Sequence, residues 1–225
     1  MSDAPREKTF LLARPEARAL EWIARRLPAR VLPDHLTILA LLAAGGIAAA
    51  YALSGNGPGW LLAVCGLLIV HWLGDSLDGT LARVRRIERP TYGYYVDHLA
   101  DAIATAAIGI GLGLSPFMLL SVGTLIVVAY LVLSINVYLE SYAFGRFSIG
   151  YGLLGPTELR LILIALNVAL ALHLGLDFTV GDLRMTVLDL IGLAIAGTMI
   201  ALLFGRVARN LRELARREPS APRRG

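Results

Sequence analysis

The sequence contains only one cysteine, Cys65, and few charged side chains. Asp, Glu, Lys and Arg make up 17% of its 225 residues, against about 25% in a typical soluble protein. A single cysteine excludes a disulfide framework and a cysteine-ligated metal site within the chain. Exposed aromatic residues do not alternate with the basic ones, so the net charge of +4 does not indicate binding to nucleic acid.

Hydrophobic residues account for 56% of the chain, and they fall in long uninterrupted runs. A helix needs about 20 mostly apolar residues to cross a bilayer, and six runs are long enough. Segments rich in Gly, Pro, Ser and Asn separate them. The sequence therefore predicts an all-α integral membrane protein that forms a single domain over residues 1–225. The expected spans are residues 35–54, 59–84, 92–113, 116–140, 156–175 and 184–206.

The basic residues are distributed very unevenly between the two sides of the predicted membrane protein. With six spans, 20 of the 21 Lys and Arg residues lie on one side: before residue 35, in residues 83–89 and 146–160, or after residue 205. Only Arg184 lies on the other side. Because basic loops remain in the cytoplasm, we expect both termini to lie on the cytoplasmic side of the cell membrane.

An amphipathic segment precedes the first span. Ala17, Leu20, Ile23 and Leu27 recur at helical spacing within residues 15–28, and charged residues occupy the other positions. This pattern predicts a helix that lies on the cytoplasmic membrane surface, and a fully solvated helix is the alternative.

Glycines recur inside the expected spans. A glycine allows two membrane helices to approach each other closely. The sequence therefore predicts helix contacts at Gly45, Gly46, Gly109, Gly111 and Gly197.

Four aspartates lie in the second and third expected spans. Each ionised side chain at bilayer depth costs about 2.5–3.5 kcal/mol, so four together need compensation. Asp75 and Asp78 share one helix face, and Asp97 and Asp101 share another, because residues three or four apart are neighbours on a helix. A short loop joins the two spans, which are therefore antiparallel neighbours. We expect the two acidic faces to meet near the cytoplasmic end.

Oxygen ligands of this kind favour Mg²⁺, Mn²⁺ or Ca²⁺ over zinc. Two such ions are able to share carboxylates and to hold a diphosphate between them. Gly79, Ala82 and Gly93 leave room for a ligand on the same faces, and Arg83 offers hydrogen-bond donors to phosphate. A structural polar cluster and a divalent-cation transporter are the alternatives. Arg83 disfavours transport because it repels cations.

These residues form one continuous pattern that resembles the signature of the CDP-alcohol phosphotransferases. It is Asp75-x-x-Asp78-Gly79-x-x-Ala82-Arg83-x₉-Gly93-x-x-x-Asp97-x-x-x-Asp101. The resemblance implies an enzyme of phospholipid synthesis that transfers a substituted phosphate group from a CDP-linked donor to an alcohol hydroxyl and releases CMP. It also implies a homodimer in the lipid bilayer.

The same resemblance implies a role for each residue of the pattern. Asp75, Asp78 and Asp97 are expected to bind two Mg²⁺ or Mn²⁺ ions, and Asp101 is expected to face the metals and to act as the general base. Residues 33–37 resemble a Pro-Asn-x-x-Thr motif of the family, with an aspartate in place of the asparagine. The residues expected at the CDP-linked donor are Asp34, Thr37, Gly79, Ala82, Arg83, Thr91 and Gly93.

Members of the family differ in which substrate carries the CDP. One group combines CDP-diacylglycerol with a soluble alcohol, and the other combines CDP-choline or CDP-ethanolamine with diacylglycerol. Two features resemble the second group: His98 after the third aspartate, and the segment from Glu140 to Glu158. Carboxylates and aromatic rings suit an ammonium headgroup, so an acceptor or headgroup site is expected at His98, Glu140, Tyr142 and Glu158. Interfacial ion pairs of these glutamates with Arg146 or Arg160 are the alternative, and the sequence leaves both substrate groups open.

Overall fold

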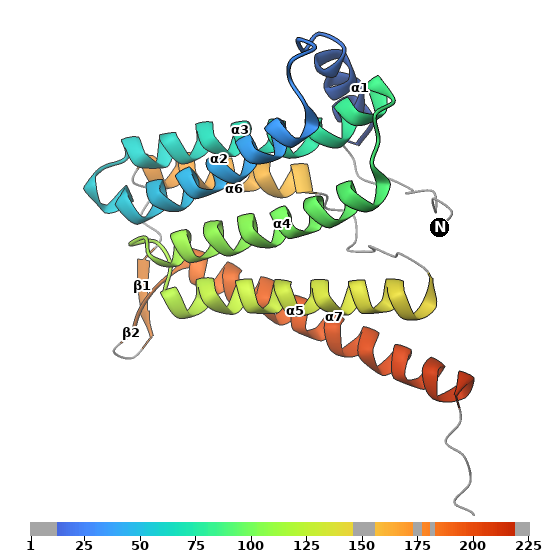
Figure 1. The fold of residues 1–225 in the computed structure, drawn as a ribbon. Helices are drawn as coiled ribbons and strands as arrows, with labels where there is room; N and C mark the ends of the chain where they lie inside the picture. The colour runs from blue at the N-terminus through green and yellow to red at the C-terminus, as the bar shows by residue number, and fades with distance from the viewer. Residues whose placement is uncertain (1–12, 146–155, 173–176, 181–182, 219–225) are drawn as a thin grey trace, which may run out of the picture.

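The protein is a bundle of long helices that lie alongside one another (Figure 1). The structure is a computed structural model and describes residues 13–145, 156–172, 177–180 and 183–218. A pair of short strands lies at one end of the bundle, and helix α1 lies at the other (Figure 1). The elements are α1 (Ala13–Ala24), α2 (Pro33–Leu53), η1 (Ser54–Asn56), α3 (Gly59–Arg85), α4 (Pro90–Gly113), α5 (Leu120–Phe144), α6 (Pro156–Ala171), β1 (Asp177–Val180), β2 (Leu183–Thr186) and α7 (Val187–Arg217).

Five helices of the described chain are long and apolar enough to cross a membrane: α2, continued by η1, and α3, α4, α5 and α7. The remaining expected span, residues 156–175, corresponds to α6. This helix has 16 residues and is about 24 Å long at 1.5 Å per residue, which is shorter than the others. The structure therefore supports a multi-pass membrane protein with five candidate spans in the described residues.

A hairpin that the sequence did not predict separates α6 from α7. Strands β1 and β2 pair in antiparallel fashion, with Asp177 opposite Thr186 and Val180 opposite Leu183. The prediction that a span begins at residue 184 is therefore wrong, since α7 begins at Val187. Thr186 caps α7, because its side chain accepts hydrogen bonds from the backbone N–H groups at the helix start.

Two further boundaries differ from the prediction. Helix α5 begins at Leu120 and not at residue 116, because the preceding loop is held by the start of α7. The Leu119 N–H donates to Asp189 Oδ1 at 2.7 Å, and Thr186 Oγ1 donates to the Phe117 carbonyl at 2.6 Å. Helix α7 continues to Arg217 and not to residue 206, because its last turns are built of strong helix-forming residues.

The apolar face of α1 packs against the protein. Leu20 and Ala24 are buried in a cluster with Leu77 and Leu81 of α3. The helix ends at Ala24 and not at residue 28. The guanidinium of Arg85 forms hydrogen bonds with the backbone of the segment that follows. It donates to the carbonyls of Leu27, Pro28, Ala29 and Val31. A helix therefore lies in the predicted segment with other bounds, and part of its apolar stripe covers α3. Its place on the membrane surface stays a prediction.

Glycines allow close helix packing at some of the expected positions. A Cβ atom on Gly111 of α4 would lie 2.8 Å from Ala48 Cβ of α2 and 2.9 Å from its carbonyl oxygen. Gly109 similarly approaches Val127 of α5, and Gly46 approaches Leu67 of α3. Gly45 and Gly197 have no described neighbour within 4 Å of such an atom. The packing role therefore belongs to Gly46, Gly109 and Gly111.

We expect Gly111→Ala to destabilise the protein by about 1–3 kcal/mol, because overpacking forces the backbones of α2 and α4 apart. Gly66→Ala is the matched control, since nothing described lies within 4 Å of a Cβ atom at that position of α3. Thermal unfolding in detergent, followed by tryptophan fluorescence, measures the difference. Equal melting temperatures for the two variants would contradict the close approach at Gly111.

Candidate active site

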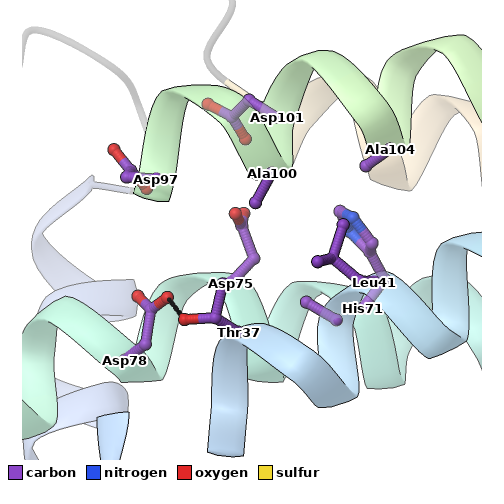
Figure 2. A pocket seen from close by; sticks show the side chains of 10 residues that line it. Thr37, Leu41, His71, Asp75, Asp78, Asp97, Ala100, Asp101 and Ala104 are labelled. Carbon is purple, nitrogen blue, oxygen red and sulfur yellow. Dashed lines mark hydrogen bonds between the residues drawn. The ribbon is translucent and has the colours of Figure 1, made fainter. Parts of the chain in front are cut away.

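A small pocket lies between α2, α3 and α4 and is lined by all four aspartates (Figure 2). Asp75 of α3 points toward Asp101 of α4, and Asp97 lies one turn away from Asp101 (Figure 2). Helix periodicity places each pair on one face, and the packing of both α3 and α4 against α2 brings the two faces together. The full lining is Thr37, Ala40, Leu41, His71, Asp75, Asp78, Asp97, Ala100, Asp101 and Ala104.

The carboxylate of Asp75 forms an ion pair with α6. Arg160 Nη2 donates to Asp75 Oδ2 at 2.5 Å, and both side chains are largely buried. The pair compensates one of the four negative charges, since burying an unpaired carboxylate costs several kcal/mol. Arg160 is therefore part of the candidate site.

Asp78 is held by hydrogen bonds from two neutral groups. Thr37 Oγ1 of α2 donates to Asp78 Oδ2 at 2.6 Å, and the Gly79 backbone N–H donates to Asp78 Oδ1 at 2.5 Å. Hydrogen bonds to a carboxylate are stronger than those between neutral groups. They fix Asp78 at the α2–α3 contact, and they place Thr37 beside an expected metal ligand.

The acidic side chains do not form a closed metal cage as they stand. Within the described residues, no three Asp, Glu, His or Cys side chains come close enough together to hold one ion. The pocket space is about 10 Å³, close to the minimum for one water molecule. The physical reason is that carboxylates repel one another. Protein groups also hold Asp75 and Asp78, and Asp97 lies 3.5 Å from Nδ1 of His98. The chemical type of these ligands does fit: four carboxylates that line one pocket offer the oxygen atoms that Mg²⁺ or Mn²⁺ prefers.

The residues expected at the CDP-linked donor lie at one end of the bundle, beyond the pocket. Gly79, Ala82 and Arg83 belong to the last two turns of α3, and Thr91 and Gly93 belong to the first turn of α4. The exposed guanidinium of Arg83 donates to the neighbouring Thr80 at 3.1 Å. A Cβ atom on Gly93 would meet no described atom within 4 Å. This end of α3 and α4 is therefore open to a ligand.

Asp34 forms an exposed ion pair at the same end of the bundle. Its carboxylate, in the first turn of α2, accepts a hydrogen bond from Arg89, which lies just before α4. Its hydrogen bond to the Asp34 carboxylate raises the pKa of Arg89 above its ordinary value, so the guanidinium stays charged. Arg89 therefore joins the starts of α2 and α4, and Asp34 already has a partner.

Glu140 belongs to a different polar network. Its carboxylate accepts hydrogen bonds from Arg206 of α7 at 2.5–3.2 Å, from Asn136 at 2.7 Å and from Asn210 at 2.6 Å. Its oxygens are therefore taken up by protein donors between α5 and α7. Among the described residues, its ion-pair partner is Arg206. Arg146 lies outside the described residues, and the role of Glu140 at a headgroup stays a prediction.

The other residues expected at an acceptor site do not gather at one place. His98 packs against the rings of Tyr94 and Tyr138, at centroid distances of 4.1 Å and 5.1 Å. Tyr142 is 92% exposed, whereas Glu158 is buried in the first turn of α6. None of them lines the aspartate pocket. The connecting segment, residues 146–155, lies outside the described residues.

Sequence reasoning missed how α6 is anchored beside the pocket. Glu16 Oε1 of α1 accepts hydrogen bonds from Trp72 of α3 at 2.9 Å and from Thr157 of α6 at 2.8 Å. Thr157 lies one turn before Arg160, the partner of Asp75. Glu16 and Thr157 are 141 positions apart, so no local pattern predicts the contact. The anchor fixes the α6 turn that carries Arg160.

Comparison with known protein families gives a match over most of the chain. The family described as CDP-alcohol phosphatidyltransferase matches residues 30–207. This range includes every element from α2 to α6 and the larger part of α7. A comparison with individual curated proteins gives no match.

We expect Arg160→Gln to lower the melting temperature in EDTA, because removing one partner of a buried ion pair costs about 3–5 kcal/mol. If the pocket takes a divalent cation, Mg²⁺ or Mn²⁺ compensates the charge of Asp75, and much of this loss is recovered. Arg206→Gln is the matched control, since it breaks the buried pair with Glu140. Thermal unfolding with and without metal tests this, and equal recovery in both variants would contradict a metal at the pocket.

Proposed function

The chain belongs to the CDP-alcohol phosphatidyltransferase family, and we propose that its aspartate pocket transfers a substituted phosphate group from a CDP-linked donor to an alcohol. The family indicates a phosphotransferase of phospholipid synthesis, and the apolar helices place it in a membrane. One observation carries the assignment to the pocket. The four aspartates of the sequence pattern, which come from two helices, line the same space.

We propose that Asp75, Asp78, Asp97 and Asp101 hold two divalent cations, Mg²⁺ or Mn²⁺. Carboxylate oxygens are the ligands that these ions prefer. When bound, such ions neutralise the negative charge of a diphosphate and of its leaving group. Arg160 pairs with Asp75 in the structure. A bound cation would neutralise the same carboxylate and would weaken that ion pair.

The CDP-linked donor is proposed to bind at the open end of α3 and α4, next to the pocket. Arg83 is exposed there, and its planar guanidinium suits a phosphate. Gly79 and Gly93 leave the backbone accessible, and Thr37 reaches the same site beside Asp78. Asp34, Ala82 and Thr91 complete the expected set at the starts of α2 and α4 and the end of α3.

Asp101 is proposed to be the general base. Its carboxylate takes the proton from the acceptor hydroxyl, and the hydroxyl oxygen then forms a bond to the β-phosphorus of the donor. The bond between that phosphorus and the oxygen bridging to the α-phosphate breaks, and CMP leaves with the electron pair. Positioning and charge stabilisation provide most of the catalysis in such transfers. A rigid pocket between packed helices suits that requirement.

An activity assay is needed to decide which of the two substrate groups the protein uses. His98 lies 3.5 Å from the pocket residue Asp97, whereas Glu140, Tyr142 and Glu158 do not line the pocket, so these positions do not decide between the groups. CDP-diacylglycerol with a soluble alcohol and CDP-choline or CDP-ethanolamine with diacylglycerol are both retained. Both use the same chemistry at the aspartates.

We also propose that α6 crosses the membrane with the five longer helices, so that both termini and the pocket face the cytoplasm. The distribution of 20 of 21 basic residues on one side supports this orientation. A homodimer is proposed from the family resemblance.

We expect Asp78→Asn and Asp101→Asn each to reduce CMP release by at least about 10²–10⁴-fold, since a general base contributes that much and Asp78 is a proposed metal ligand. Asp78→Asn is also expected to weaken Mn²⁺ binding, measured by calorimetry. Asp189→Asn is the control, because Asp189 only holds the start of α7 and the preceding loop. Its turnover per folded molecule is expected to match the wild type. Wild-type turnover in either pocket variant would contradict the site.

We expect CMP release from at least one of CDP-diacylglycerol, CDP-choline and CDP-ethanolamine when Mg²⁺ or Mn²⁺ and the matching acceptor are present. Purified protein in mixed micelles with labelled donors provides the measurement, and EDTA provides the metal-free control. Cation uptake into proteoliposomes without CMP release from any donor would favour a transporter over the enzyme.

A further inference from the structure

A histidine occupies the membrane-side end of the aspartate pocket. His71 is 6% exposed and lies one helical turn before Asp75 on the same face of α3. Its ring lines the pocket beside Leu41 and Ala104 (Figure 2). The proposed phosphotransfer assigns it no role.

One ring nitrogen of His71 lacks a partner. Nδ1 is buried and has no hydrogen-bond partner among the residues that the structure describes. A buried polar atom without a partner is destabilising, and nearly all such atoms in folded proteins are satisfied. An apolar side chain of the same size would pack at this position without that cost. The partner of Nδ1 is therefore a molecule that enters the pocket, either a water or a bound ligand.

The depth of His71 restricts what that group is. Counting 1.5 Å per residue from Gly59, Asp75 lies about 24 Å and His71 about 18 Å along α3. His71 thus lies about 6 Å farther from the cytoplasmic end of the helix than Asp75. Beside it lie the apolar side chains of Leu41 and Ala104, and Asp75 follows one turn along the same helix face (Figure 2). A water-soluble substrate approaches from the cytoplasmic end, whereas this end of the pocket suits the lipid.

In both versions of the reaction, the glycerol backbone of the lipid lies next to the reacting phosphorus. CDP-diacylglycerol carries its glycerol oxygen on the β-phosphorus, and diacylglycerol supplies the oxygen that attacks it. The ester oxygens of the backbone follow within a few bonds. A lipid that enters from the membrane therefore brings a hydrogen-bonding oxygen to the membrane side of the aspartates.

We propose that His71 binds the lipid substrate, with Nδ1 hydrogen-bonded to an oxygen of the glycerol backbone. This inference rests on the proposed function, because it takes the aspartates as the site of phosphate transfer. It adds the position of the lipid: on the membrane side of the aspartates, with the nucleotide at the open cytoplasmic end. His71 orients the lipid and takes no part in the proton transfer to Asp101.

Three substitutions separate hydrogen bonding from packing. His71→Leu removes both ring nitrogens and keeps an apolar side chain of similar size. In His71→Asn, the amide lies as many bonds from Cβ as Nδ1 does, whereas in His71→Gln it corresponds to Nε2. Asn167→Leu is the control, since Asn167 is also buried but bonds Tyr51 in another cluster.

Kinetics in mixed micelles test the proposal, with the lipid mole fraction and the soluble substrate varied separately. One arm uses CDP-diacylglycerol with soluble alcohols, and the other uses diacylglycerol with CDP-choline or CDP-ethanolamine. In the arm where the wild type is active, we expect His71→Leu to raise KM for the lipid about tenfold, as for one lost hydrogen bond. KM for the soluble substrate is expected to change less than about twofold, and the melting temperature is not expected to fall.

His71→Asn is expected to restore most of the lipid KM, and His71→Gln is not. Asn167→Leu is expected to lower the melting temperature and to leave the lipid KM unchanged. Wild-type kinetics in His71→Leu, an equal rise of both KM values, or rescue by Gln and not by Asn would each overturn the assignment to Nδ1.

The proposed function and this inference fail in different ways. Absence of CMP release by the wild type in both arms contradicts the proposed function. Thermal unfolding with diacylglycerol or CDP-diacylglycerol then tests His71 without turnover. Stabilisation of the wild type and not of His71→Leu supports the lipid contact, and equal responses of the two proteins overturn it.

Discussion

Four carboxylates in a largely apolar bundle are the constraint on which the rest of the structure depends. Each ionised group at bilayer depth is costly, and mutual repulsion adds to that cost. The protein meets part of it with its own groups: Arg160 pairs with Asp75, and Thr37 and the Gly79 N–H bind Asp78. Asp97 lies 3.5 Å from Nδ1 of His98, and the one arginine among these partners balances one of the four charges. A pocket of this kind favours divalent cations.

The compensation requires close and rigid helix packing. Thr37 reaches Asp78 because α2 and α3 approach at Gly74, where a Cβ atom would lie 2.7 Å from a backbone carbonyl of α2. The contact of Gly111 with Ala48 similarly allows α4 to approach α2 closely. Small residues therefore serve the site indirectly, because they bring helices with polar side chains near enough for hydrogen bonds.

Two buried ion pairs of the bundle differ in what surrounds them. Arg206 and Glu140 join α5 to α7, and two asparagine amides complete the hydrogen bonding of the carboxylate. Arg160 and Asp75 join α6 to α3 at the edge of a pocket with three further acids. The first pair is saturated and holds helices together. Under the proposed function, a bound cation would replace the arginine of the second pair, so the same chemistry would serve structure in one place and function in the other.

Local features of the sequence determined the long helices and the two acidic faces. Hydrophobic runs and the spacing of Asp75, Asp78, Asp97 and Asp101 depend only on helix geometry, which repeats every 3.6 residues. The hairpin before α7 and the pairing of Arg160 with Asp75, 85 positions apart, were decided by tertiary packing. Glu140 shows the same limit, because family resemblance suggested a ligand site, while tertiary packing placed hydrogen-bond donors of α7 beside its carboxylate. A helix fixes which residues share a face through its own backbone hydrogen bonds, but which faces meet depends on the packing of the whole bundle.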